Sequence, residues 1–200
     1  MGGSRLRLYL TRALAVAVLA LFAIGGTHWA IAHPLLEKSL FILGIGAAGI
    51  GAAGRVWATS YISGLKLREL VTRGPYSTCR NPLYFFSMIL GIGLGLCTET
   101  LSMPLVIGLV LALLYFFQIR REERMLLDRF GQEYLTYCSS VPCFFPSYRN
   151  YVEADQIHIS PRLLKKGLFG TAFLLLLIGV LELLKALHAS GVVPVLLHVY

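Results

Sequence analysis

Long apolar runs alternate with shorter polar segments along the chain. Five of these runs reach or approach the ~20 residues that a helix needs to cross a bilayer. They occupy residues 8–32, 38–58, 83–98, 101–119 and 162–187. The pattern therefore predicts an all-α integral membrane protein with about five transmembrane helices.

The third run ends and the fourth begins around the short sequence "TET" at 98–100, which predicts a helical hairpin. A polar, basic connector at 59–82 precedes the hairpin, and its stretch 62–74 could lie as a short helix along the membrane surface. Residues 120–138 follow the hairpin and are amphipathic. In this segment apolar side chains recur at a spacing of three to four, at Leu126, Leu127, Phe130, Tyr134 and Tyr137.

The amphipathic segment is predicted to extend the second arm of the hairpin into the cytoplasm and to bend near Gly131. A proline-bounded aromatic loop follows at 139–148. We expect one membrane domain over residues 1–200, with two N-terminal spans in 1–58 and a catalytic core with the hairpin in 59–150. The run at 162–187 is an additional span, which could shape substrate access or a homo-oligomer surface.

Composition and charge support this reading. The chain is 56% hydrophobic and 14% charged, whereas soluble domains are nearer a quarter charged. Its net charge is +8. Most basic residues lie in polar segments, and five spans would place these segments on one side of the membrane, as the positive-inside rule expects. The N-terminus and the polar segments are therefore predicted to be cytoplasmic, at a bacterial inner membrane or the endoplasmic reticulum, and no nucleic-acid partner is expected.

The second run contains "GIGAAGIGAAG" at 44–54, which matches G-x-G-x-x-G twice. A dinucleotide fingerprint needs a preceding strand, and here the motif lies within one apolar helix. Small residues at this spacing instead let helix backbones approach closely in a membrane. The four cysteines are expected to be reduced packing residues. They and the five histidines show no metal-ligand spacing, so no metal is expected.

Two polar segments, 59–82 and 120–161, are long enough to build a site at the membrane–water boundary. The first contains "TRGPYSTCRNPLYFF" at 72–86. Pro82 suits the first turn of a helix, and Asn81 can cap that helix. Arg80 offers a planar fork for an anion. Tyr76 and Tyr84 offer aromatic faces for a cation.

The second segment begins with Glu122 and Glu123. Adjacent helical residues point about 100° apart, so one carboxylate could bind a ribose diol or an ammonium group while the other pairs with Arg80 or Arg120. The set suits a zwitterionic cofactor that carries a nucleoside. The same residues could alternatively be interface anchors and a solvated helix face.

The quoted segments resemble the integral membrane methyltransferases, which include isoprenylcysteine carboxyl methyltransferases and phospholipid N-methyltransferases. "RGPYSTCRNPLY" is similar to their G-P-Y-x-x-x-R-x-P-x-Y signature. "REERMLLDRFGQEYLTYCSSVPCFFP" is similar to their E-E-x-x-L-x-x-x-F-G-x-x-Y-x-x-Y…V-P-x-x-x-P segment. The carboxyl methyltransferases typically carry His where this chain has Asn81, so the motif is nearer the phospholipid type.

The resemblance implies a helical membrane enzyme that uses S-adenosylmethionine on the cytosolic side. With the reading of the residues above, it implies a cofactor pocket formed by Tyr76, Arg80, Asn81, Pro82, Tyr84, Gly91, Gly93, Glu122, Glu123, Tyr134 and Tyr137. Arg80, Glu122 and Glu123 are the catalytic candidates. The partners would be membrane lipids and a lipophilic acceptor, such as a phospholipid amine or an isoprenylcysteine-type carboxylate.

Two alternatives stay open at this stage. One is an NADPH-dependent membrane reductase, since sterol reductases resemble this superfamily in their C-terminal half. In that case Arg120, Arg121 and Arg124 would serve the 2′-phosphate. The other is a membrane scaffold without chemistry.

Overall fold

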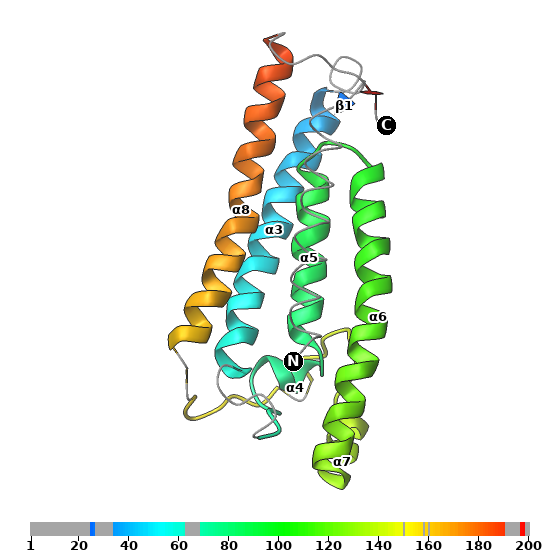
Figure 1. Cartoon of the computed structure of the whole chain (residues 1–200), viewed down its shortest axis with the longest axis vertical. Coiled ribbons are helices and arrows are strands. Elements are labelled where there is room, and N and C mark those ends of the chain that lie inside the picture. The colour runs from blue at the N-terminus through cyan, green and yellow to red at the C-terminus, as the bar shows by residue number, and fades with distance from the viewer. Residues whose placement is uncertain are drawn as a thin grey trace.

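The computed structural model describes residues 25–26, 34–62, 69–149, 151–157, 159, 161–190 and 197–198. Within these residues, four long helices stand side by side as an antiparallel bundle (Figure 1). They are α3 (Pro34–Ile62), α5 (Pro82–Leu96), α6 (Ser102–Phe130) and α8 (Pro161–Ala189). The prediction of an all-α membrane protein is confirmed.

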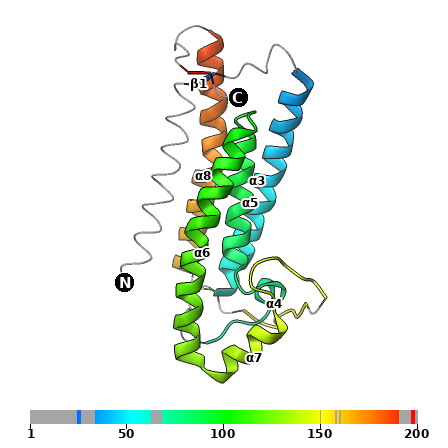
Figure 2. The same ribbon diagram turned by 90° about the vertical axis from the view of Figure 1, so that its right-hand side faces the viewer.

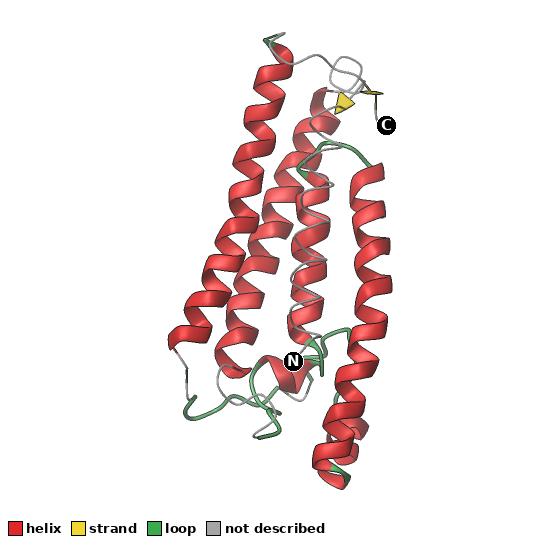
Figure 3. Ribbon diagram, in the orientation of Figure 1, coloured by secondary structure: helices red, strands yellow, loops and turns green. Residues whose placement is uncertain are grey.

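Smaller elements close the two ends of the bundle. The short helices α4 (Pro75–Thr78) and α7 (Gln132–Ser140) lie together at one end, here called the α4–α7 end (Figure 2). At the other end the two-residue strands β1 (Gly25–Gly26) and β2 (Leu197–His198) pair in parallel (Figure 3). Apart from β1, the span expected at 8–32 lies outside the described residues, so the number of five spans stays a prediction.

Three described helices are long and apolar enough to cross a membrane, within Leu35–Ile62, Ser102–Phe130 and Gly167–Leu187. Helix α5 is also apolar but has only 15 residues. Helix α3 runs beyond the span predicted at 38–58 at both ends. Arg55, a charged residue within the predicted span, lies inside the helix. Beyond the expected end, Tyr61 packs against Gly74 and Thr59 lies against Gly167 of α8.

Glycines bring α3 and α5 into close contact. A Cβ on Gly51 would lie 2.5 Å from the backbone N of Leu90, and a Cβ on Gly93 would lie 2.5 Å from the backbone N of Ala48. These distances are too short for any side chain, so the two backbones meet directly. The helix-packing interpretation of residues 44–54 is confirmed.

The predicted hairpin is formed by α5 and α6, joined at residues 97–101. Buried side chains from both arms make one core cluster along their length, consisting of Tyr84, Ile107, Leu111, Tyr115 and Ile119. Met88, Cys143 and Phe144 pack against this cluster. The loop after α7 therefore folds back onto the hairpin near the α4–α7 end.

The turn of the hairpin is tied to α8 by an ion pair. Glu99 is buried and has a left-handed backbone with φ 58°, a conformation that costs a non-glycine residue about 1–2 kcal/mol. Its Oε1 lies 2.6 Å from Nζ of Lys185, and that ammonium also lies 4.6 Å from the ring centroid of Phe41 on α3. The contacts of Lys185 therefore link three elements, namely the hairpin turn, α8 and α3.

The amphipathic segment follows its prediction. Helix α6 ends at Phe130, and Gly131, with φ 52°, turns the chain into α7. The short surface helix suggested for 62–74 is wrong for the described residues 69–74, which are not helical. Gly74 has φ 59° and donates its N–H to Val152, so the local backbone bonds to a distant segment instead of to itself.

Candidate active site

Two segments far apart in the sequence run antiparallel at the α4–α7 end. One is 74–81, which contains α4, and the other is 142–152, which follows α7. Three backbone hydrogen bonds join them: Gly74 N to Val152 O at 2.7 Å, Ser147 N to Thr78 O at 2.9 Å, and Arg80 N to Pro142 O at 2.9 Å. The pairing fixes the backbone on both sides of the candidate site.

The first segment, 74–81, is held rigidly by close packing and by prolines. A Cβ on Gly74 would lie 2.3 Å from the ring of Tyr61, so only glycine fits between that ring and the turn. Pro75 and Pro82 begin α4 and α5 and are fully buried. Proline suits the first helical position because its φ angle is already helical and because the N–H that it lacks would have no partner within the helix there. This rigid stretch thus fixes the positions of Arg80 and Asn81 between α4 and α5.

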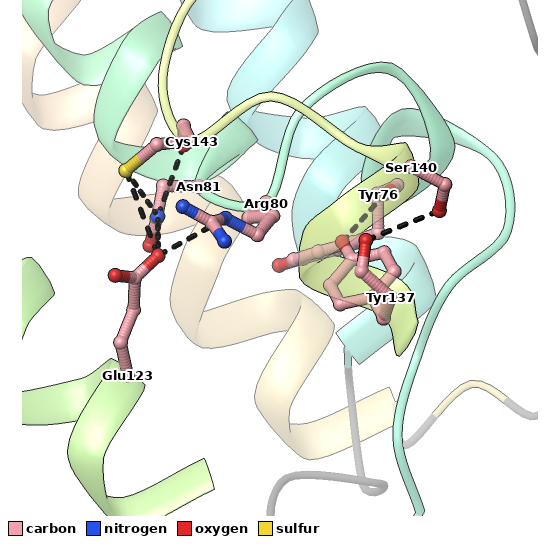
Figure 4. Close-up of polar contacts among 7 residues, drawn as sticks. All are labelled: Tyr76, Arg80, Asn81, Glu123, Tyr137, Ser140 and Cys143. Carbon is pink, nitrogen blue, oxygen red and sulfur yellow. Dashed lines mark hydrogen bonds and ion pairs between the residues drawn. The ribbon is translucent and has the colours of Figure 1, made fainter. Parts of the chain in front are cut away.

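Arg80 and Glu123 form the centre of the site (Figure 4). Nε of Arg80 lies 3.2 Å from Oε1 of Glu123, and the two side chains are 16% and 24% exposed. The thiol of Cys143 points at the same carboxylate oxygen, with Sγ 3.5 Å away. Glu123 comes from α6, so this one oxygen joins the hairpin's second arm, the segment before α5 and the loop after α7.

Asn81 occupies the N-cap position of α5 as predicted, but its side chain does not cap the helix. Its Nδ2 donates instead to the backbone oxygen of Cys143 at 3.0 Å and to Oε1 of Glu123 at 3.3 Å. These two bonds of the amide nitrogen orient the side chain toward the loop and the carboxylate. Asn81 is therefore part of the polar cluster.

The electrostatics of the cluster keep Arg80 charged. Burial lowers the pKa of Arg80, but the Cys143 thiol and the carboxylate of Glu123 outweigh that effect, and the pKa lies above its ordinary value. A guanidinium that is held in place and permanently charged is a suitable recognition group for a carboxylate of a ligand.

Three tyrosines line the site on the side of α4 and α7. The hydroxyl of Tyr137 donates to the backbone oxygen of Tyr76 at 2.6 Å and so locks α7 onto α4 (Figure 4). Tyr134 packs beside Tyr137, with ring centroids 6.1 Å apart. Burial raises the pKa of all three tyrosines, and the charge of Glu123 raises that of Tyr134 further. All three hydroxyls are neutral at physiological pH.

Two buried polar atoms in this region lack a hydrogen-bond partner among the described residues. They are Nε of Arg80, which contacts Glu123 as a charge without an aligned hydrogen bond, and Oη of Tyr134. Buried polar groups in folded proteins are rarely left unpaired. Together with the guanidinium and the carboxylate, they fit a zwitterionic ligand that carries a nucleoside.

Other residues of the predicted set have partners outside the Arg80–Glu123 pair. Glu122 accepts a hydrogen bond from Gln118 one turn earlier on α6, at 3.3 Å, so the two adjacent glutamates do point differently. Tyr84 packs against Tyr115, with ring centroids 4.9 Å apart. Pro82 starts α5.

Gly91 and Gly93 lie farther along α5, about 15 Å or more beyond Asn81 at 1.5 Å per residue. A Cβ on Gly91 would meet Leu111 of α6 at 2.5 Å, and Gly93 faces Ala48 of α3. Both glycines are explained by contacts between helices.

Cys143 is the site residue that sequence reasoning missed. We had taken the four cysteines as packing residues. All four are free thiols, yet Cys143 lies among the charged groups. The available signal was its place directly after Pro142, whose carbonyl binds the N–H of Arg80. Among the residues that the structure describes, no three His, Cys, Asp or Glu side chains are arranged to hold a metal ion.

Comparison with known proteins adds an independent observation. A family model described as phospholipid methyltransferase matches residues 29–133. The cobalt-zinc-cadmium resistance protein CzcN of Cupriavidus metallidurans is 34% identical over 94% of this chain and 86% of its own length. The nickel-cobalt-cadmium resistance protein NccN of Alcaligenes xylosoxydans is 35% identical over 72% of this chain and 66% of its own length. No solved structure matches.

Proposed function

Because the chain belongs to the phospholipid methyltransferase family, we propose that it transfers a methyl group from S-adenosylmethionine to a lipophilic acceptor in the membrane. The acceptor is a phospholipid amine or an isoprenylcysteine-type carboxylate, and the active site opens to the cytoplasm. The observation that carries the proposal is the Arg80–Glu123 pair, with the buried hydroxyl of Tyr134 near it and without a hydrogen-bond partner among the described residues.

Each polar group of the site has a counterpart in S-adenosylmethionine. Arg80 would hold the carboxylate of its amino-acid part, since a guanidinium binds carboxylates through parallel hydrogen bonds. Glu123 would take the ammonium group or the ribose hydroxyls. The hydroxyl of Tyr134 would form a hydrogen bond to the nucleoside. When bound, the cofactor supplies an activated methyl group on a sulfonium.

The protein's own task is mainly to hold the acceptor and to exclude water. Orienting two reactants at near-attack distance is a large part of such catalysis. A carboxylate acceptor needs no base, whereas an amine must first lose a proton. We propose that the carboxylate of Glu122 takes up that proton. Glu122 is adjacent to Glu123 in the sequence but is not part of the ion pair with Arg80.

The metal-resistance names of the two relatives enter the proposal only indirectly. In this proposal a resistance role of this chain would act through its methylated product.

The test is direct binding to the full chain purified in detergent. We expect calorimetry to show binding of S-adenosylmethionine and of its demethylated product, and no binding of NADPH. Arg80→Ala should abolish cofactor binding without loss of helical circular dichroism. The matched control is Arg129→Ala, at the exposed end of α6, which should bind as the wild type does.

Binding of NADPH alone would replace the proposal with the reductase alternative, for which Arg120, Arg121 and Arg124 were considered. Arg120 lies 4.2 Å over the ring of Phe116 on its own helix. Binding of lipid but of neither cofactor would favour a scaffold.

A further inference from the structure

The protein's contacts with the carboxylate of Glu123 converge on one of its two oxygens. Oε1 lies 3.2 Å from Nε of Arg80, 3.3 Å from Nδ2 of Asn81 and 3.5 Å from Sγ of Cys143. Among the described residues, no hydrogen bond or ion pair of Glu123 involves Oε2, and Figure 4 shows this second oxygen on the side away from Arg80. One oxygen is therefore used by the protein, and the other can accept a hydrogen bond from a ligand.

The thiol of Cys143 is held in place independently of that carboxylate. The N–H of Arg80 donates to the backbone oxygen of Pro142 at 2.9 Å, and the side chain of Asn81 donates to the backbone oxygen of Cys143 at 3.0 Å. The next residue, Phe144, packs against the core cluster of the hairpin. Sγ therefore occupies a position that the backbone of the loop determines.

A donor in a fixed position restricts the rotation of Glu123. A glutamate side chain that becomes ordered only when a ligand binds loses conformational entropy at that moment, which weakens binding. Hydrogen bonds that hold the side chain beforehand reduce this loss. The thiol has one proton to donate, and the contact with Oε1 directs that proton to a charged acceptor. Cys143 thus supplies one of three groups that orient the carboxylate.

A separate observation indicates that a ligand binds beside Glu123. The side chain of Tyr134 is buried, with only 3% of the residue exposed, and its hydroxyl has no hydrogen-bond partner among the described residues. Buried hydroxyl groups are rarely left in this state. This hydroxyl is close enough to Glu123 to be affected by its charge, so one ligand could contact both.

We propose that Cys143 is a positioning residue for the cofactor, because its thiol holds Oε1 of Glu123 and so directs Oε2 toward the ligand. This inference rests on the proposed binding of S-adenosylmethionine at the site. It assigns to Cys143 no contact with the methyl group and no part in the transfer. The contact between thiol and carboxylate exists without any cofactor and can be tested separately.

The first measurement is calorimetric titration of the full chain in detergent with S-adenosylmethionine and with its demethylated product. We expect Cys143→Ala to weaken binding of both by about three- to tenfold, since it removes one weak donor to a charged acceptor and leaves two others. Cys143→Ser keeps a donor and should bind within about twofold of the wild type. The matched control is Cys97→Ala, which removes a fully buried thiol after the last residue of α5, at the hairpin turn, and should bind as the wild type does.

A double variant separates this role from packing. In the Glu123→Gln background, Cys143→Ala should change the affinity by less than about twofold, because the charge that the thiol orients is already gone. A cysteine that only packs would give the same loss of affinity in both backgrounds, with no rescue by serine. That result would overturn the proposal, as would wild-type affinity in Cys143→Ala that circular dichroism shows to be folded.

Infrared spectroscopy tests the contact in the absence of cofactor. The S–H stretching band of Cys143 is the difference between the spectra of the wild type and Cys143→Ala. We expect this band to move toward the frequency of a free thiol in Glu123→Gln, since an amide is a weaker acceptor than a carboxylate. An unmoved band would overturn the proposal.

The two measurements together distinguish this inference from the proposed function. A band that moves in a protein that binds no S-adenosylmethionine would defeat the proposed function and leave Cys143 as the residue that orients Glu123. Cofactor binding with no dependence on Cys143 would do the reverse.

Discussion

Nε of Arg80, in the residue before α5, lies 3.2 Å from Oε1 of Glu123 on α6, while the neighbouring Glu122 bonds to Gln118 on its own helix. Two adjacent glutamates thus have different partners, and their roles can be separated by mutation.

We expect Glu123→Gln to weaken binding of S-adenosylmethionine by about 10- to 100-fold, because it leaves the half-buried guanidinium of Arg80 without its counter-charge. Glu122→Gln should change binding by less than about threefold, as expected for a partly exposed group, and should instead slow turnover of an amine acceptor. Calorimetry and methyl-transfer assays on both variants check this. Equal losses of binding would contradict the assignment.

The close contact of α3 and α5 predicts a strong position dependence among glycines. Gly93→Ala places a methyl group 2.5 Å from the backbone N of Ala48, and such overpacking should destabilise the protein by about 1–3 kcal/mol. Gly46→Ala is the matched control, since nothing lies within 4 Å of its new Cβ. Thermal unfolding in detergent should show a lower Tm for the first variant and an unchanged or slightly higher Tm for the second.

Thiol alkylation should distinguish two cysteines of the same region. Cys79 is fully buried, and burial raises its pKa to about 11, so only about 0.1% is thiolate at pH 8. We expect N-ethylmaleimide to label the partly exposed Cys143 first and Cys79 only after unfolding. The demethylated cofactor product should slow labelling of Cys143. Peptide mass spectrometry gives the order, and early labelling of Cys79 would contradict the packing described.

The hairpin turn predicts a pH dependence of stability. Burial raises the pKa of Glu99 to about 7, against the partial compensation of Lys185. A carboxyl whose pKa is higher in the folded state than in the unfolded state binds its proton more tightly when folded. Its contribution to stability is therefore present at low pH and is lost as the pH rises from about 4.5 to about 7.

We therefore expect the Tm of the wild type to fall over that interval, and the fall to be smaller in Glu99→Gln. The control is Asp128→Asn, an exposed change on α6 that should keep the wild-type slope. A Tm that rises with pH in the wild type alone would show that the ion pair with Lys185 dominates.

Much of the fold could be predicted because apolar runs and their breaks carry most of the information. The hairpin at residues 97–101, the extension of α6 to Gly131 and the packing role of residues 44–54 all follow from local patterns. The ends of α3 could not be predicted in the same way. Its last turns include the charged Arg55, whose hydrogen bond to Ser87 on another helix no local pattern predicts.

The site could be predicted in its residue types and partly in its pairing. One glutamate was expected to pair with Arg80 or Arg120, and it is Glu123 that pairs with Arg80. Which of the two adjacent glutamates faces Arg80 depends on the rotation of α6 about its axis, which the sequence does not specify. The side chain of Asn81 and the thiol of Cys143 depend on the path of the loop after α7. A local motif contains no information about that path.

The antiparallel pairing of 74–81 with 142–152 has a consequence for the order of events during synthesis. The backbone partners of Gly74, Thr78 and Arg80 are made some 60 to 80 residues after them. Arg80 therefore leaves the ribosome before the carboxylate of Glu123 and the carbonyl of Pro142 exist. The candidate active site is completed late in biogenesis, after the hairpin has formed and the chain up to Val152 has been made. A nascent chain stopped before that residue would lack it.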